Sequence, residues 1–216
     1  MKDLRQLLIL AEELVSEIKG YISNEEEPDG SLKNVTDDYW QVTDDGKLKT
    51  SELLAKCKEK FAVYCFWNGK DLNRNFPPPV ELTTRYFKKN VEADKEHTNK
   101  SANDLDKLGV KGITLRERLI LESQYFHETG KHLDIGNVTL CAGSRGFDGG
   151  VPGVDWGTAS RGLCVHWCSP DDRNARLRAR AAVSLDTFYK TNTYHSSPSP
   201  SQCPTCKQYL GRDTVC

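Results

Sequence analysis

The chain has 216 residues, of which 37% are hydrophobic, and its formal net charge at pH 7 is -1. This length is sufficient for one or two domains with a substantial buried core. The near-neutral charge excludes a general electrostatic attraction to nucleic acid or anionic membranes, so we expect no nucleic-acid partner.

No segment near the start predicts a membrane-spanning helix. The longest apolar run there, residues 7–11, is much shorter than the roughly 20 residues that a bilayer requires. The acidic residues Glu12, Glu13 and Glu17 follow closely, and the segment does not resemble a secretory signal. We therefore expect a cytoplasmic protein without membrane insertion, unless it is exported by a route that the sequence does not show.

Residues 3–22 have the apolar spacing of one amphipathic helix, with leucines or other aliphatic residues at three- and four-residue steps. We expect this helix to pack on a core. Leu4, Ala11 and Ile18 also fit a heptad, so pairing with another helix is the alternative.

The middle of the chain predicts short elements. The runs 39–42 and 47–49 flank Asp44-Asp45-Gly46, which indicates a hairpin. Thr50 or Ser51 would cap a helix over 52–60, and residues 61–67 have the composition of a strand. Residues 92–107 are polar and predict an exposed helix or linker, with Ser101 and Asp104 as a helix start.

A longer helix is predicted after residue 112. Thr114 and Glu117 form a capping box, the helix runs to about residue 128, and Gly130 is a natural stop. His127 is expected to be a charge partner at the helix C-terminus, and His132 a packed imidazole.

Two runs with period-two alternation follow, at 154–156 and 163–167, and 177–185 predicts a final strand. The alternation assigns two faces to the first two strands. The core face would hold Val154, Trp156, Leu163, Val165 and Trp167. The opposite face would hold Asp155, Cys164, His166 and Cys168.

Residues 132–189 contain no Lys, Glu, Gln or Met, although they contain many Arg and Asp residues. One interpretation is a Gly/Arg/Asp-rich β domain, because strands and tight turns disfavour Lys and Glu. A second interpretation comes from the genetic code. Randomising the adenines of AAC codons gives only NNC codons, which never encode Lys, Glu, Gln, Met or Trp. Trp156 and Trp167 would then belong to a fixed scaffold.

This stretch resembles the variable region of diversity-generating retroelement target proteins. The resemblance covers about residues 112–186 and depends on four runs: Leu140-Cys-Ala-Gly-Ser-Arg145, Val151-Pro-Gly-Val-Asp-Trp156, Leu163-Cys-Val-His-Trp167 and Leu177-Arg-Ala-Arg-Ala-Ala-Val-Ser-Leu185. In that family, varied side chains form a ligand-binding face on a C-type lectin-like fold. Such variable regions commonly end the chain, whereas about thirty residues follow here.

The resemblance implies a division between scaffold and surface. The scaffold would comprise Trp156, Trp167, Leu163, Val165, Leu177 and Val183. The ligand-binding candidates would be Phe147, Asp148, Asp155, Thr158, Ser160, Cys164, His166, Cys168, Asp171, Asn174 and Arg176. A face with this mixture can make apolar and hydrogen-bonded contacts with a protein or another macromolecule.

The eight cysteines allow competing chemistry. Cys203 and Cys206 form a C-x-x-C motif, and Cys216 and His195 could complete a structural zinc site. A cysteine-containing flexible tail is the simpler interpretation, and a dithiol redox motif lacks a supporting helix pattern. Cys164, His166, Cys168 and Asp155 could form a metal site or a Cys–His nucleophile pair, but no oxyanion motif accompanies them.

Together these patterns predict an α+β protein. Residues 1–111 would form a helical or mixed N-terminal region, 112–190 a C-type lectin-like ligand-binding domain, and 191–216 a Ser/Pro linker and Cys-rich tail. The predicted function is non-catalytic ligand binding by a diversified surface. The alternatives are a relative of the formylglycine-generating oxidases, which share the lectin-like architecture and use paired cysteines, and a zinc-binding interaction protein.

Overall fold

The computed structural model describes residues 38–183. The predicted helix over 3–22, the final part of the strand over 177–185, and the zinc ligands His195, Cys203, Cys206 and Cys216 lie wholly or partly outside these residues. Within the described part, the fold is α+β, as the sequence predicts, and its strands form two sheets. The C-type lectin-like architecture stays a prediction.

The smaller sheet pairs β1 (Tyr39–Asp44) with β3 (Thr83–Lys88) in antiparallel register. The predicted hairpin between residues 39–42 and 47–49 is therefore wrong. Asp44 accepts two hydrogen bonds of 2.7 Å from the buried Arg116 guanidinium, which fixes the end of β1. Gly46, at a φ of 68°, then leads the chain toward a helix instead of into a second strand.

The larger sheet has the strand order β2-β6-β5-β4-β7. Its strands are β2 (Ala62–Cys65), β4 (Val138–Leu140), β5 (Val151–Gly157), β6 (Gly162–Cys168) and β7 (Leu177–Arg178). Strands β5 and β6 form the antiparallel hairpin that the alternation predicts. The predicted final strand is shorter, since only β7 and isolated bridges at Ala181 and Val183 represent it in the described part.

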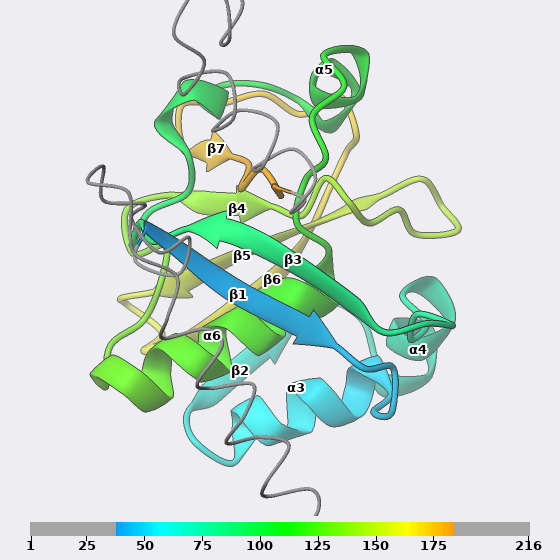
Figure 1. Cartoon of the computed structure of the whole chain (residues 1–216), viewed down its shortest axis with the longest axis vertical. Helices are drawn as coiled ribbons and strands as arrows, with labels where there is room; N and C mark the ends of the chain where they lie inside the picture. The colour runs from blue at the N-terminus through cyan, green and yellow to red at the C-terminus, as the bar shows by residue number, and fades with distance from the viewer. Residues whose placement is uncertain (1–37, 184–216) are drawn as a thin grey trace, which may run out of the picture. The chain divides into compact units, whose positions relative to one another are not determined.

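Helix α6 (Leu115–Thr129) lies between the two sheets, with β1 and β3 on one side and the hairpin of β5 and β6 on the other (Figure 1). Thr114 and Glu117 form its capping box, and Gly130 ends it at a φ of 67°, so this prediction is confirmed. The main core around α6 includes Val42, Leu54 and Phe87 as well as Leu119, Val154 and Leu163.

Three shorter α-helices and the 3-10 helix η1 (Lys95–His97) complete the described unit. Helix α3 (Thr50–Lys58) confirms the helix predicted over 52–60, but Lys49 is its N-cap, and Thr50 instead contacts Arg116 and the Phe76 carbonyl. Helix α4 (Gly69–Asn75) was not predicted. Helix α5 (Ala102–Lys107) has the predicted Ser101 cap, and its buried Leu105 shows that the segment is not an exposed linker.

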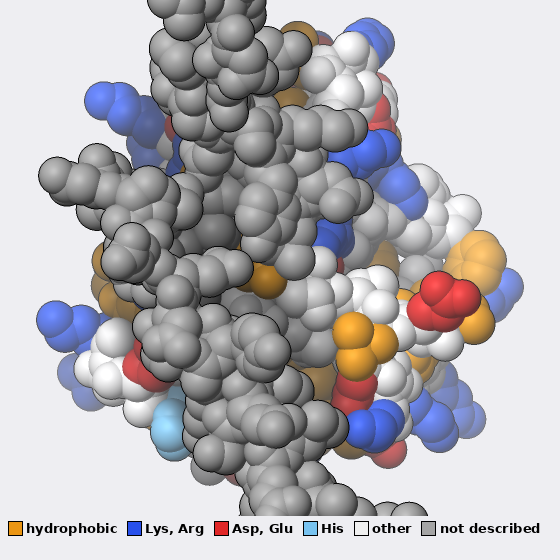
Figure 2. Space-filling model, viewed as in Figure 1, with side chains coloured by type: hydrophobic (Ala, Val, Ile, Leu, Met, Phe, Trp, Pro, Cys, Tyr) orange, Lys and Arg blue, Asp and Glu red, His pale blue; other side chains and the backbone are white. Residues whose placement is uncertain are grey.

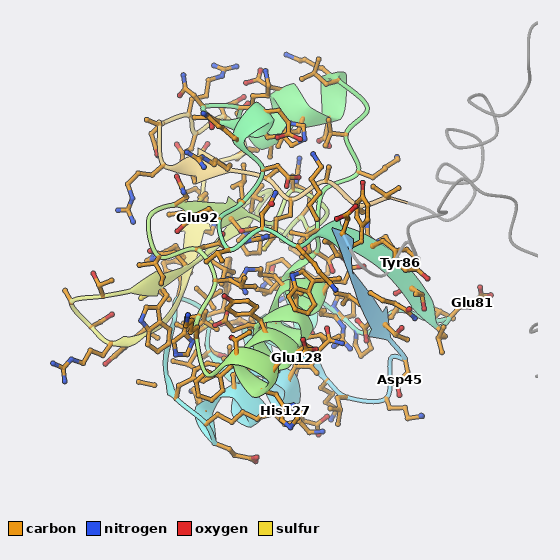
Figure 3. All side chains as sticks on the ribbon, turned by 60° about the vertical axis from the view of Figure 1, so that its left-hand side comes forward. Asp45, Glu81, Tyr86, Glu92, His127 and Glu128 are labelled. Atoms are coloured by element: carbon orange, nitrogen blue, oxygen red, sulfur yellow. The ribbon has the colours of Figure 1, made fainter. Side chains whose placement is uncertain are left out.

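Residues 38–183 belong to one compact unit. Strand β2 pairs in parallel with β6, and Tyr86 of β3 forms a bridge with Val183. Figure 3 shows Tyr86 on β3 and Glu92 beside the loop that precedes β4. The Glu92 carboxylate accepts backbone hydrogen bonds from Gly136 and Asn137. The boundary expected between residues 111 and 112 therefore falls inside this unit.

A group of fully buried charged side chains links α6 to the larger sheet. Arg118, Glu122, Asp134 and Arg180 are each at most 1% exposed. Asp134 accepts hydrogen bonds from Arg118 (3.0 Å) and Arg180 (2.7 Å). Burial alone would raise the pKa of Asp134, but the charges of Arg180 and Arg118 bring it below its ordinary value. No hydrophobic periodicity could indicate these residues.

His132 confirms its expected role as a packed imidazole. Its ring stacks on Trp156 with centroids 3.3 Å apart, and its Nδ1 lies 2.9 Å from a carboxylate oxygen of Glu122.

No helix in residues 38–183 is both long and apolar enough to cross a membrane. The cytoplasmic location stays a prediction.

Candidate functional site

The hairpin of β5 and β6 has two different faces, and strand register assigns each side chain to one of them. Val154 lies opposite Val165, and Trp156 lies opposite Leu163, on the face that packs toward α6. Asp155 lies opposite Cys164, and Gly153 lies opposite His166, on the other face. The predicted alternation therefore places these residues correctly.

One end of this second face is covered. Val151 and Cys168 pack with Ala102 and Leu105 of α5 and with Leu177 in a second apolar cluster. Cys168 is only 8% exposed, and burial raises the pKa of its thiol to about 11. Cys168 is therefore a core residue, and its assignment to the ligand-binding surface is wrong. Alternation shows which side chains share one face of a strand. It does not show which part of that face is covered by another segment of the chain.

The other end of the face stays open. Tyr64 pairs with Cys164 in parallel register, so Tyr64 extends the same face onto β2, and Phe66 follows two residues later. Their exposed fractions are 53% and 67%. We call this surface, formed by Tyr64, Phe66, Ser160, Cys164, His166 and Arg176 around Asp155, the sheet face. Asp155 itself is buried, so the expectation that it is a surface residue is wrong. A shallow groove of about 370 Å³ runs along β2 and β6 there.

Asp155 organises the polar part of the sheet face. Its Oδ1 lies 2.7 Å from His166 Nε2, and its Oδ2 lies 3.5 Å from an Arg176 guanidinium nitrogen. Asp155 is 6% exposed, whereas His166 and Arg176 are largely open to solvent. The hydrogen bond to Asp155 raises the pKa of His166 above its ordinary value.

Cys164 lies beside this pair. Its Sγ is 3.6 Å from the Ser160 hydroxyl and 3.6 Å from the Gly162 carbonyl oxygen. Among the described side chains, no hydrogen bond joins Cys164 to His166, whose Nε2 is turned toward Asp155. This arrangement does not favour the Cys–His nucleophile pair. Asp155, Cys164 and His166 do form a group that could hold a metal ion.

Trp167 was predicted to lie in the core, and this prediction is wrong. It is 39% exposed, and its indole nitrogen donates a hydrogen bond of 2.9 Å to Asp148. Its position in the alternation is that of Leu163 and Val165, but it lies beyond the end of the main core. It packs instead over Gly150, where a Cβ would lie 2.0 Å from the indole nitrogen. Trp156 is half-buried against Phe61 and His132.

The remaining candidates lie in loops. The Asn75 side chain accepts a hydrogen bond from the backbone of Phe147, whose ring lies under Arg74. Asp171 accepts one from the Asn103 amide. Asn174 accepts backbone hydrogen bonds from Arg176 and Leu177, so its side chain shapes a turn. Thr158 is exposed in the turn between β5 and β6.

The structure therefore brings together Asp155, Ser160, Cys164, His166 and Arg176. Phe147 and Asp148 lie nearer the Trp167 end of the hairpin. Sequence reasoning missed Tyr64 and Phe66, although the apolar run at 61–67 was visible. The sequence did not show that this run forms an edge strand of the larger sheet. Its place at the edge results from parallel pairing with β6, which is distant in the chain.

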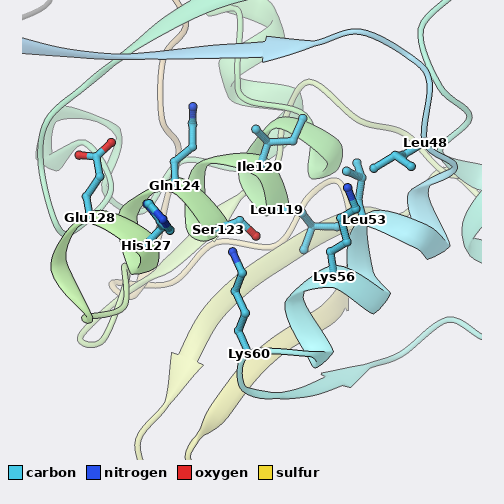
Figure 4. Close-up of a pocket in the computed structure, with 10 residues that line it drawn as sticks. All are labelled: Leu48, Leu53, Lys56, Lys60, Leu119, Ile120, Ser123, Gln124, His127 and Glu128. Carbon is cyan, nitrogen blue, oxygen red and sulfur yellow. The ribbon is translucent and has the colours of Figure 1, made fainter.

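A second concavity lies between α3 and α6 (Figure 4). Leu53, Leu119 and Ile120 contribute apolar surface to this groove of about 330 Å³, and Lys60 extends from the end of α3 toward Ser123. It contains no residue of the sheet face. Figure 2 shows Lys and Arg side chains at several separate places on the visible surface, not in one continuous block.

Comparison of the chain with protein-family models, with curated proteins and with solved structures finds no match.

Proposed function

We propose that this protein binds a ligand through a diversified surface and is not an enzyme. The surface would be the sheet face and the neighbouring loops, carried by a C-type lectin-like scaffold as in the target proteins of diversity-generating retroelements. The ligand would be a protein or another macromolecule.

The observation that carries this proposal is the separation of roles within residues 132–189. Eight of the eleven candidate positions are exposed: Phe147, Asp148, Thr158, Ser160, His166, Asp171, Asn174 and Arg176. Side chains between them, such as Val154, Leu163 and Val165, are almost fully buried. Within the stretch that lacks Lys, Glu, Gln and Met, buried side chains thus alternate with exposed ones. A protein that varies its surface while its core stays constant requires such an arrangement.

The chemistry of the sheet face suits a macromolecular partner. Tyr64 and Phe66 offer exposed aromatic area next to the charged pair of Asp155 and Arg176. Rigid aromatic anchors beside adaptable polar groups are typical of protein-binding surfaces. Several arginines among the described residues are paired with carboxylates, such as Arg173 with Asp104, which does not favour a nucleic-acid surface.

The oxidase alternative requires reactive paired cysteines. Cys168, the last residue of β6, and Cys141, which follows β4, are both buried, and burial raises the pKa of both thiols. A buried, protonated thiol is a poor nucleophile and a poor metal ligand. The zinc-binding alternative depends on His195 and the tail cysteines, which lie outside the described residues.

The test is a library in which the codons of Thr158, Ser160, Asp171 and Arg176 are randomised together. Most members should melt cooperatively within a few degrees of the parent, because each change costs about 0.5 kcal/mol or less. Selection against a panel of unrelated proteins should yield members with different partners.

A matched control library randomises Val154, Leu163, Val165 and Leu177, and most of its members should fail to fold. The proposal is contradicted if the surface library also unfolds widely. It is equally contradicted if its folded members lose one constant chemical activity without any change of partner.

A further inference from the structure

We propose that Asp155, Cys164 and His166 bind a divalent transition-metal ion of the zinc class on the sheet face. This site is distinct from the zinc site predicted in the tail, and it goes beyond the proposed ligand-binding function.

The backbone brings the three ligands together. Cys164 and His166 are two residues apart on β6, so they project from the same face, and Asp155 is the direct pairing partner of Cys164. One ligand atom from each residue lies within 4.8 Å of the others. Ligand atoms around a tetrahedral zinc ion are roughly 3.5 Å apart, so small side-chain rotations would complete the geometry.

The space around the ligands favours such rotations. Cys164 is half-buried, and the His166 side chain is 49% exposed, so an ion can enter from the groove along β2 and β6. Asp155 is held on the sheet, which limits the ordering that the ion must impose.

The donor set selects the class of ion. One imidazole nitrogen, one thiolate and one carboxylate oxygen together suit zinc or cobalt better than the hard cations calcium and magnesium. Binding releases to solvent the thiol proton of Cys164 and, from an imidazolium, the extra ring proton of His166, so that the aspartate and the thiolate neutralise the dication. Water would fill the fourth position on the open side.

Two neighbours would modulate affinity. Ser160 lies 3.6 Å from the Cys164 sulfur and can donate a hydrogen bond to the thiolate. Arg176 contacts Asp155 Oδ2, and its positive charge opposes an incoming cation. Because the Arg176 side chain is 62% exposed, it can swing away without loss of core packing. Removing it should therefore strengthen metal binding.

The experiment is a titration with Co²⁺ of the full chain carrying Cys203→Ser, Cys206→Ser and Cys216→Ser, which removes the tail thiols. We expect about one equivalent to bind, with a thiolate-to-cobalt charge-transfer band and displacement by zinc. Cys164→Ser should abolish the band, and His166→Asn should weaken binding by at least about tenfold.

Two variants serve as internal controls. Cys65→Ser removes a half-buried thiol on the neighbouring strand that faces away from the site, and it should leave the titration unchanged. Arg176→Ser should tighten binding several-fold, an effect that damage to the fold would not produce. Circular dichroism of each variant establishes that it is folded.

The proposal is overturned if the parent shows no charge-transfer band, or if Cys164→Ser leaves the band intact. It is also overturned if Arg176→Ser weakens binding. Any of these results leaves the ligand-binding function standing, because that function is measured by the partners of the surface library and not by metal.

Discussion

At the scale of single residues, the buried carboxylate of Asp134 is the most consequential group in the described part of the chain. It receives charged hydrogen bonds from Arg118 and Arg180, and a hydroxyl hydrogen bond of 2.5 Å from Thr139. Asp134→Asn removes one of the two carboxylates that neutralise the buried Arg118 and Arg180, and the remaining carboxylate, Glu122, pairs with Arg118 but not with Arg180, so we expect a loss of about 3–5 kcal/mol in the free energy of unfolding. Urea denaturation measures this loss, and Asp171→Asn is the exposed control.

The same residue gives a pH dependence. The pKa of Asp134 is lowered in the folded protein from an ordinary value of 3.8, so its contribution to stability is complete above that value. The contribution decreases as the pH falls below 3.8 toward the folded pKa, because only the unfolded chain takes up the proton. The stability difference between the parent and Asp134→Asn should therefore be constant near neutral pH and shrink in acid. A difference that grows in acid would show that Asp134 is not ionised in the fold.

The two tryptophans of the hairpin should differ in their contribution to stability. Trp156 packs against His132 and Phe61, so we expect Trp156→Ala to cost about 3 kcal/mol. Trp167 is 39% exposed, and Trp167→Ala should cost about 1 kcal/mol. Thermal melting of the two variants compares them directly. Equal losses would contradict the placement of Trp167 at the rim.

These residues also show how far sequence reasoning extends. Period-two alternation assigned Leu163, Cys164, Val165 and His166 to the correct faces, because the geometry of a strand is local. It could not show that α5 covers Cys168 or that the core ends before Trp167, since both facts depend on distant segments. Among the buried ion pairs, Arg118 with Glu122 had a local signal, the four-residue spacing on one helix, whereas the pairs with Asp134 and Asp44 had none.

At the scale of elements, the caps of α5 and α6 and the local hairpin of β5 and β6 were predictable, whereas pairing between distant strands was not. The Thr114–Glu117 and Ser101–Asp104 boxes begin α6 and α5 where the sequence indicates. The run Asp44-Asp45-Gly46 has the composition of a hairpin turn, but β1 pairs with β3 across a long insertion. Arg116 of α6 donates a hydrogen bond to Asp44 at the position where the predicted hairpin would turn.

The turn at Gly46 gives a prediction with a built-in control. Gly46 and Gly109 have φ values of 68° and 70°, but only at Gly46 would a Cβ meet a backbone atom, the Pro79 oxygen at 2.5 Å. We expect Gly109→Ala to cost about 1–2 kcal/mol from backbone strain alone. Gly46→Ala should cost about 3 kcal/mol, because the contact with Pro79 adds to the strain. Chemical denaturation of both variants measures the difference. Equal losses in the free energy of unfolding would show that the contact with Pro79 makes no contribution.

At the scale of the whole molecule, the main core of residues 38–183 is built from side chains of both halves of this segment. The main core combines Val42, Leu54 and Phe87 from the first half with Leu119 and Val154 from the second. The sequence predicted the α+β class but not this unity, because the parallel pairing of β2 with β6 joins segments that are far apart in the chain. No composition shift at residue 111 could reveal it.

This unity predicts the behaviour of two fragments. Residues 112–190 alone would expose the β6 edge and two sides of α6, so we expect no cooperative unfolding transition in calorimetry. Residues 38–190 retain every described element and should unfold cooperatively. An independently folded 112–190 fragment would instead support the domain boundary expected from the sequence.

The measurement that tests the diversified surface most directly is sequencing of this gene from many cells of one population. We expect substitutions to concentrate at the codons of Thr158, Ser160, Asp171, Asn174 and Arg176. These codons should have the form NNC, and those of Asp134, Trp156 and Leu163 should stay constant. Substitutions spread evenly along the chain, or Lys and Glu at the varied positions, would contradict a surface diversified through adenines.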